Sequence, residues 1–171
     1  MKIAEILARM IAFSEGNIHD IDHFLRVWAY AKTIGELENL DAETQYLLEA
    51  AAITHDIACP LCREKYGNTD GKHQEREGEV LVREFLWGTD ISPGQTERIA
   101  FLVGHHHTLG NIEGMDYQIL VEADYIANAS ENGYGRRNVE NFIEKVMRTE
   151  SGRAVARAVL CAGTAVSAGK E

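Results

Sequence analysis

The sequence predicts an all-α fold, a single-domain helical bundle of about seven or eight helices. Long stretches rich in Ala, Glu, Leu, Ile and Arg carry apolar residues three and four positions apart, which is the period of an α-helix. The alternating pattern of a half-buried β-strand is essentially missing, and the chain contains only two prolines. At 171 residues the chain is most simply one domain, which we place at residues 1–162.

The first two helices are predicted from apolar stripes and polar ends. Residues 2–14 form the first helix, which is expected to end near Gly16. Its apolar stripe consists of Ile3, Ile6, Leu7, Met10 and Ile11. Asp20 or Asp22 is expected to cap a second helix that continues through Glu36. Its inner face consists of Phe24, Val27, Trp28, Ala31 and Ile34.

The third helix and the segment after it differ sharply in composition. Asp41 followed by Ala-Glu-Thr indicates an N-cap and an acidic first turn, and the helix is expected to reach His55 and Asp56. From Cys59 to Lys72 the sequence changes to one that contains Pro, Gly, Asn, Thr and Asp, which predicts a loop. In so small a domain, a loop of this length is more often a functional lid than a linker.

The rest of the chain predicts further helices. The fourth begins between His73 and Glu77 and ends near Trp87. Ser92 and Pro93 open the fifth, which reaches the histidine run, because proline suits the first turn of a helix. The remaining helices are expected over 117–129, 137–148 and 151–161. The last residues, 163–171, are rich in small residues and glycine and are expected to be a frayed C-terminal tail.

Composition limits the classes of partner. A formal charge of −10 and a pI near 5.2 argue against binding to duplex nucleic acid, which needs a basic surface. A small phosphorylated ligand is still compatible, because a bound metal can reverse the local field. The N-terminus does not resemble a secretory signal, and no apolar run approaches the ~20 residues that cross a membrane. Three cysteines, an odd number, fit a reducing compartment, so the cytoplasm is the expected location.

Histidine and aspartate occupy positions that should face the core. His55 and Asp56 end an apolar run, and imidazole and carboxylate are common ligands of divalent metals. His23 lies one turn before Val27 on the apolar side of its helix, and Asp124 lies on the buried stripe of another. Each position alone has an ordinary structural explanation, as a cap, a core histidine or a salt-bridge partner. A buried aspartate is nevertheless costly unless it is paired or bound to a metal.

These positions and their surroundings resemble the motifs of the HD-domain metal-dependent phosphohydrolases. The resemblance covers roughly residues 17–130 and rests on 23–27 (HFLRV), 52–57 (AITHDI) and 123–124 (AD). It implies an all-helical fold with His23, His55, Asp56 and Asp124 as primary metal ligands. It also implies that Asp56 acts in catalysis, and that Arg26 orients a carboxylate or meets a phosphate.

The run from His105 to His107 resembles the additional histidines of family members that bind two metals. Following the apolar phase of the preceding helix, we favour His105 and His106 as ligands and leave His107 to contact substrate or support a ligand. The alternative is an exposed run without function. His19, one turn before His23, could extend the cluster, although a solvent-facing position is the simpler expectation.

His73 is the candidate for the remaining ligand of a second metal. The sequence departs from the family here, because relatives place that histidine four residues before a packed glycine. The corresponding residue before Gly78 is Gln74. Either an irregular helix start admits His73, or Glu75 or Glu77 replaces it, or one ion alone binds tightly.

The resemblance implies hydrolysis of a phosphoester or phosphoanhydride bond in a small, nucleotide-like substrate by metal-activated water. One or two divalent ions are expected, with Fe, Mn, Zn, Co or Ni better suited than Mg to mixed nitrogen and oxygen ligands. Lys65, Lys72 and Arg76 could grip phosphate. Alternatives are a regulatory module that binds a ligand with little turnover and an oxygenase with a di-iron centre.

A homodimer is compatible with the sequence, and no membrane partner is expected.

Cys59 and Cys62 form a lone Cys-x-x-Cys pair, which we interpret as incidental, since structural zinc would need a second pair. A redox role would require a strand-to-helix setting that a helical sequence does not provide.

Overall fold

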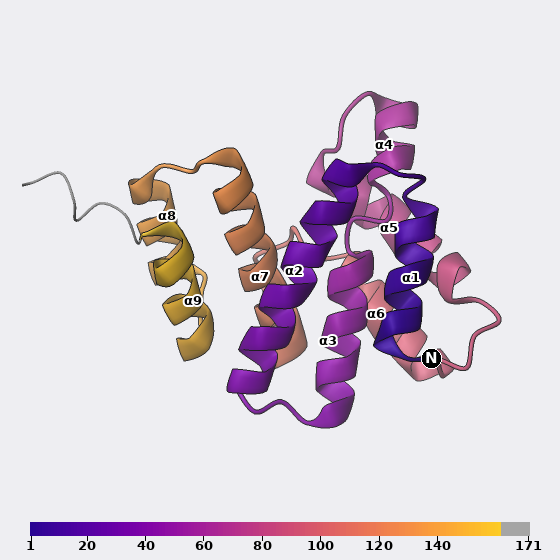
Figure 1. Ribbon diagram of the computed structural model, residues 1–171, viewed down its shortest axis with the longest axis horizontal. Coiled ribbons are helices and arrows are strands. Elements are labelled where there is room, and N and C mark those ends of the chain that lie inside the picture. The colour runs from indigo at the N-terminus through magenta and orange to yellow at the C-terminus, as the bar shows by residue number, and fades with distance from the viewer. Residues whose placement is uncertain (162–171) are drawn as a thin grey trace, which may run out of the picture.

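The computed structural model describes residues 1–161, and in this part of the chain helices joined by turns and loops are present and no strand is (Figure 1). The all-α prediction is therefore confirmed. The helices of the described residues are α1 (Ile3–Phe13), α2 (Ile18–Leu37), α3 (Ala42–Thr54), α4 (Cys59–Tyr66), α5 (Gly71–Leu86), α6 (Pro93–Val103), α7 (Met115–Asn132), α8 (Arg136–Lys145) and α9 (Glu150–Leu160). The predicted tail, residues 163–171, lies outside the described residues.

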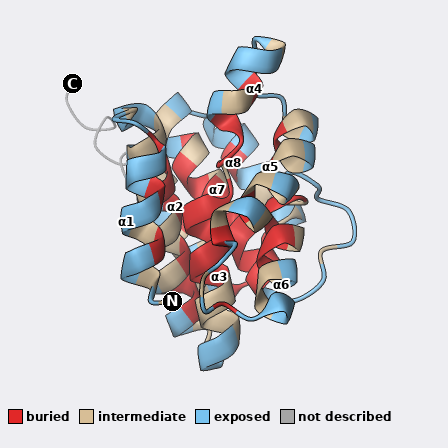
Figure 2. Cartoon of the chain, turned by 90° about the vertical axis from the view of Figure 1, so that its right-hand side faces the viewer, coloured by how far each residue is buried: buried red, intermediate tan, exposed pale blue. Residues whose placement is uncertain are grey.

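Helices α2, α3 and α7 form the centre of the bundle. Helix α2 packs against both α3 and α7, and α3 also packs against α6 and α7. Figure 1 shows α8 and α9 on one side of this centre and α1, α5 and α6 on the other. Buried residues concentrate on α3 and α7 (Figure 2), and every residue from Asp116 to Asp124 is buried. A polar side chain at these positions therefore needs a partner inside the protein. Within residues 1–161 we find no helix with both the length and the apolar character needed to cross a bilayer.

Side-chain caps begin several helices. Asp41 and Ser92 cap α3 and α6 as predicted, because their side-chain oxygens accept hydrogen bonds from backbone N–H groups of the first turn. The predicted cap of α2 is wrong. Asn17, and neither Asp20 nor Asp22, caps this helix with an oxygen that accepts the N–H of Asp20 at 3.3 Å. Asp20 therefore lies within α2.

The segment predicted as a loop, Cys59 to Lys72, contains a helix, so this prediction is also wrong. Pro60 lies in the first turn of α4, where its fixed φ is compatible with a helix. Gly67 ends α4 with a left-handed φ of 70°, which glycine adopts without strain. Proline and glycine thus mark the two ends of α4, and residues 67–70 connect it to α5.

Tyr66 joins α4 to α5. Its hydroxyl donates to Glu77 Oε1 at 2.6 Å and accepts from Arg76 Nη2 at 2.5 Å, and its ring stacks on His73 with the centroids 4.0 Å apart. Lys65 Nζ also donates to Glu77 Oε1, at 3.1 Å. The hydrogen bonds from Tyr66 and Lys65 outweigh the opposing effect of desolvation and lower the pKa of Glu77 to about 2. Lys65 and Arg76 are therefore engaged in the contact between α4 and α5.

Candidate metal centre

The four side chains expected as primary ligands meet at one point of the bundle. His23 Nε2 lies 3.3 Å from His55 Nε2, 3.3 Å from Asp124 Oδ1 and 3.5 Å from Asp56 Oδ2. His55 Nε2 lies 3.5 Å from Asp124 Oδ1 and 3.6 Å from Asp56 Oδ2. Residues from α2, from the end of α3 and from α7 are thus brought together.

The end of α3 lets two neighbouring residues face the same point. Adjacent side chains of a continuous helix diverge by about 100°, so they could not share one ion in its interior. Helix α3 ends at Thr54, and the N–H of Ile57 bonds to the Thr54 carbonyl at 3.0 Å in the turn that follows. His55 and Asp56 therefore lie in this turn, beyond the regular part of α3.

Three imidazoles present Nε2 to the centre because Nδ1 is held elsewhere. The Nδ1 atoms of His55 and His106 lie 2.9 and 2.7 Å from the carbonyl oxygens three residues earlier in the chain. A carbonyl oxygen only accepts, so Nδ1 carries the proton and Nε2 keeps a lone pair when these rings are neutral. His23 Nδ1 lies 2.9 Å from Glu131 Oε2, which favours the same arrangement. A hydrogen bond of this kind is typical of histidines that bind metals.

The donor set fits a divalent cation. His106 Nε2 is buried without a hydrogen-bond partner and lies 3.5 Å from Asp56 Oδ1. His23 and His55 direct two Nε2 atoms at each other, an arrangement that needs a proton or a cation between them. Imidazole nitrogen and carboxylate oxygen are ligands for Zn, Mn, Fe, Co and Ni. The described residues thus form a cluster able to hold a metal ion.

The ligand atoms form two groups that share Asp56. In one group the atoms belong to His23, His55 and Asp56, and in the other to Asp56, His106 and His107, with the atoms of each group within 4.8 Å of one another. Asp56 directs Oδ2 to the first group and Oδ1 to His106 of the second. A carboxylate in this position can bridge two cations.

The charges of the cluster also favour a cation. Burial raises the pKa of Asp56 and Asp124, but the nearby imidazoles, led by the charge of His55 for Asp56 and the hydrogen bond from His23 for Asp124, hold both pKa values well below the usual range. Burial lowers the pKa of His23, whereas Asp124 and Asp56 raise it to about 9. Both carboxyl groups are therefore ionised at neutral pH.

Three other residues expected at the site lie outside both groups. His105 Nδ1 lies 2.8 Å from the Phe101 carbonyl oxygen, and the His105 ring stacks on the Phe101 ring. His73 stacks on the tyrosine that joins α4 to α5. Arg26 is half exposed and reaches the cluster through Glu131, whose Oε1 lies 3.6 Å from Arg26 Nη1.

The end of α6 explains the difference between His105 and His106. Our prediction assumed that the helix continues through both residues, so that the spacing of the apolar residues of α6 would turn both towards the core. Helix α6 ends at Val103, and the histidine run lies in the turns that follow, where the helical phase no longer applies. These turns direct His106 inward and also bring His107 near Asp56.

We expect His106→Ala to weaken Mn²⁺ binding on the order of 100-fold, because it removes a buried nitrogen that faces Asp56. His105→Ala should change the affinity less than about threefold, since its ring packs on Phe101. Titration calorimetry with Mn²⁺ on both variants measures the difference. Equal losses of Mn²⁺ affinity in the two variants would contradict the placement of His106 at the metal centre and of His105 outside it.

Helix α7 supplies two residues that the sequence analysis missed. Asn128 Nδ2 donates to Asp124 Oδ1 at 2.7 Å, and Glu131 contacts His23. Asp124, Asn128 and Glu131 are four and three residues apart, so they share one face of α7. Polar residues that continue at helical spacing from Asp124 were the signal that could have identified both.

A cleft of about 220 Å³ lies over the cluster. It is bordered by residues of α2, α4, α5 and α7, and its lining includes Asp20, Cys59, Arg63, Gln74, Asn128 and Asn132. His19 lies at its rim with 85% of the side chain exposed. The lining is mainly polar and ionic, which suits a small hydrophilic ligand.

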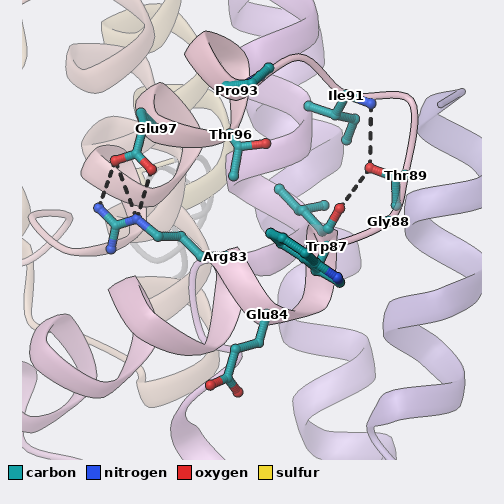
Figure 3. A pocket seen from close by; sticks show the side chains of 10 residues that line it. Arg83, Glu84, Trp87, Gly88, Thr89, Ile91, Pro93, Thr96 and Glu97 are labelled. Atoms are coloured by element: carbon teal, nitrogen blue, oxygen red, sulfur yellow. Dashed lines mark hydrogen bonds and ion pairs between the residues drawn. The ribbon is translucent and has the colours of Figure 1, made fainter.

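A larger hollow of about 580 Å³ lies between the end of α5 and the start of α6 (Figure 3). Its lining contains the exposed Trp87 and the charged residues Arg83, Glu84 and Glu97. Arg83 Nη2 donates to Glu97 Oε2 at 2.9 Å. The described residues that line it include no His, Asp or Cys. We therefore assign the functional site to the cleft over the cluster.

Comparison with known proteins agrees with the fold and the cluster. A crystal structure of a predicted HD superfamily hydrolase from an uncultured Thermotogales bacterium has a similar fold, with a TM-score of 0.66 and 21% sequence identity. The match covers 92% of this chain and 84% of that chain. No match is found among curated proteins. The family model of the HD domain matches residues 20–157, a range that contains the whole cluster, and the chain therefore belongs to the HD-domain family.

Proposed function

We propose that the protein is a metal-dependent phosphohydrolase that acts on a small phosphorylated, nucleotide-like substrate. The observation that carries the proposal is the convergence of His23, His55, Asp56 and Asp124 at the base of a polar cleft. The structural relative, itself described as a predicted hydrolase of the HD superfamily, supports the same reaction class.

A divalent cation held by these four residues would supply a Lewis acid, which lowers the pKa of a bound water and offsets charge on phosphate oxygens. The protein's own groups prepare the site. Glu131 fixes the ring of His23, and Asn128 holds Asp124 through Oδ1. Asp56 directs one oxygen to His23 and the other to His106, and in this proposal it orients the attacking water.

The test is phosphate release by the purified protein incubated with Mn²⁺ and a panel of nucleotides, sugar phosphates and other phosphate esters. We expect release from at least one class of ester, and complete loss after treatment with a chelator. Binding of these compounds without any release would contradict the proposal and indicate a regulatory module.

A further inference from the structure

Arg63 differs from the other cations near the site because it lines the cleft. It lies on α4 one turn after Cys59, and both side chains border the cleft. Among the described residues that line the cleft, Arg63 is the only Lys or Arg. Lys65 lies on the same helix but bonds to Glu77 in the contact with α5. The single permanent cation of this surface therefore comes from α4.

Arg63 is paired with an aspartate on the opposite wall. Its Nη1 donates to Asp20 Oδ1 at 3.3 Å, and its Nη2 contacts Asp20 Oδ2. Asp20 has other partners, since Asn17 Nδ2 donates to Oδ2 at 2.9 Å and His19 Nδ1 lies 3.5 Å from Oδ1. Asp20 can therefore keep hydrogen bonds if Arg63 moves away.

The Arg63 end of this ion pair is accessible to an anion. The Arg63 side chain is 42% exposed and the Asp20 side chain 13%, so solvent reaches the guanidinium group and screens part of its attraction to Asp20. The guanidinium group presents two parallel N–H donors, and this geometry fits the oxygens of a phosphate as well as those of a carboxylate. An anion that enters the cleft can therefore replace Asp20 as the partner of Arg63.

The carboxylates of the cleft would repel a phosphate, so a cationic side chain in the cleft favours its binding. Asp20, Asp56, Asp124 and Glu131 all line the cleft, so an entering phosphate meets four carboxylates. A metal would offset Asp56 and Asp124, and Glu131 is already paired with His23 and near Arg26. Asp20 is the carboxylate whose charge Arg63 offsets.

We propose that Arg63 is the phosphate-binding residue of this cleft, and that it exchanges Asp20 for non-bridging oxygens of the bound phosphoryl group. This inference rests on the proposed function, because it assigns a role to Arg63 in binding the same substrate. Asp20 is then a competitor of the phosphate, and its charge weakens substrate binding. Substitution of Arg63 should therefore weaken phosphate binding, and substitution of Asp20 should strengthen it.

The experiment is titration calorimetry with inorganic phosphate on the full chain loaded with Mn²⁺. Arg63→Gln should raise the Kd for phosphate about tenfold, because it removes a charge-assisted pair of hydrogen bonds. Asp20→Asn should lower the Kd about threefold, since it removes the carboxylate that competes with phosphate for Arg63. In the Arg63→Gln background, Asp20→Asn should have a smaller effect, because the gain requires the guanidinium group.

Two control variants remove a positive charge outside the cleft. Lys65→Gln changes the same helix, and Arg83→Gln breaks an arginine–carboxylate pair of similar geometry with Glu97. Both should bind phosphate as the wild type does, with unchanged Mn²⁺ content and circular dichroism. An Arg63→Gln protein with wild-type affinity would overturn the proposal. A loss of affinity in both Arg63→Gln and Asp20→Asn would overturn it as well, because the pair would then only position α4.

The result is separable from the proposed function. Phosphate binding that depends on Arg63, in a protein that releases phosphate from no ester, would contradict the hydrolase and keep the subsite. Hydrolysis with the same KM in wild type and Arg63→Gln would keep the hydrolase and overturn the subsite. A wild-type protein that binds no phosphate would also overturn the subsite.

Discussion

Asp56→Ala is expected to abolish phosphate release and most metal binding while the helices persist. Asp56 contributes to both groups of ligand atoms, with Oδ2 at 3.5 Å from His23 Nε2 and Oδ1 at 3.5 Å from His106 Nε2. No other described residue is shared by the two groups. In the proposed mechanism its loss removes a metal ligand and the group that orients water, so we expect kcat/KM to fall by roughly 10³-fold or more.

Three measurements check this expectation together. Phosphate release gives the rate, elemental analysis gives metal atoms per chain, and circular dichroism gives the helical content. Asp56→Asn serves as a second variant of nearly the same shape, so that a folding defect in Asp56→Ala does not decide the result. The matched control is Asp22→Ala, which removes an exposed aspartate of α2 beside His23 and outside the lining of the cleft. Turnover at the wild-type rate in Asp56→Ala would refute the mechanism.

The fold could be predicted from local patterns wherever the pattern has one meaning. The caps at Asp41 and Ser92 depend only on the residues of the first turn, and both are confirmed. The segment beginning at Cys59 could not be assigned in this way. Proline and glycine occur in loops and also at the two ends of helices, and composition alone does not distinguish these positions.

The centre of the site could be inferred because buried polar residues are costly. His23, His55 and Asp124 interrupt apolar stripes, and this cost, together with the HD-type motifs, indicated a metal. The sequence favoured both His105 and His106 as ligands, and it could not show which of the three histidines face the cluster, because this depends on the residue at which α6 ends. Element boundaries are the least certain part of a sequence-based prediction.

Contacts between segments far apart in the chain could not be predicted from sequence patterns. Arg63 meets Asp20 across 43 positions, and Glu131 meets His23 across 108. Nothing local to either residue indicates its partner. Lys65 and Arg76, which we expected to bind phosphate, instead contact Glu77, which is 12 positions from Lys65 and next to Arg76. Which cationic side chain lines the cleft therefore depends on the packing of α4.

Glu122→Ala is expected to lower the free energy of unfolding by about 3 kcal/mol. Glu122 is fully buried on α7, and Oε1 accepts Gln118 Nε2 at 2.7 Å, Arg148 N–H at 2.7 Å and Thr149 N–H at 3.1 Å. Oε2 accepts the Thr149 hydroxyl. The carboxylate thereby holds the segment that begins α9 against α7, and its removal leaves several buried donors without an acceptor.

Urea denaturation of the wild type and the variant measures this loss. Glu122→Gln keeps one oxygen acceptor and should lose about half as much, whereas Glu140→Ala, on the exposed face of α8, should stay within about 0.5 kcal/mol of the wild type. Loss of less than 1 kcal/mol in Glu122→Ala would mean that water replaces the carboxylate. Glu122 and Asp124 are two residues apart on α7 and point to nearly opposite faces. Folded Glu122→Ala should therefore bind Mn²⁺ as tightly as the wild type, which separates the support of α9 from the metal centre on the same helix.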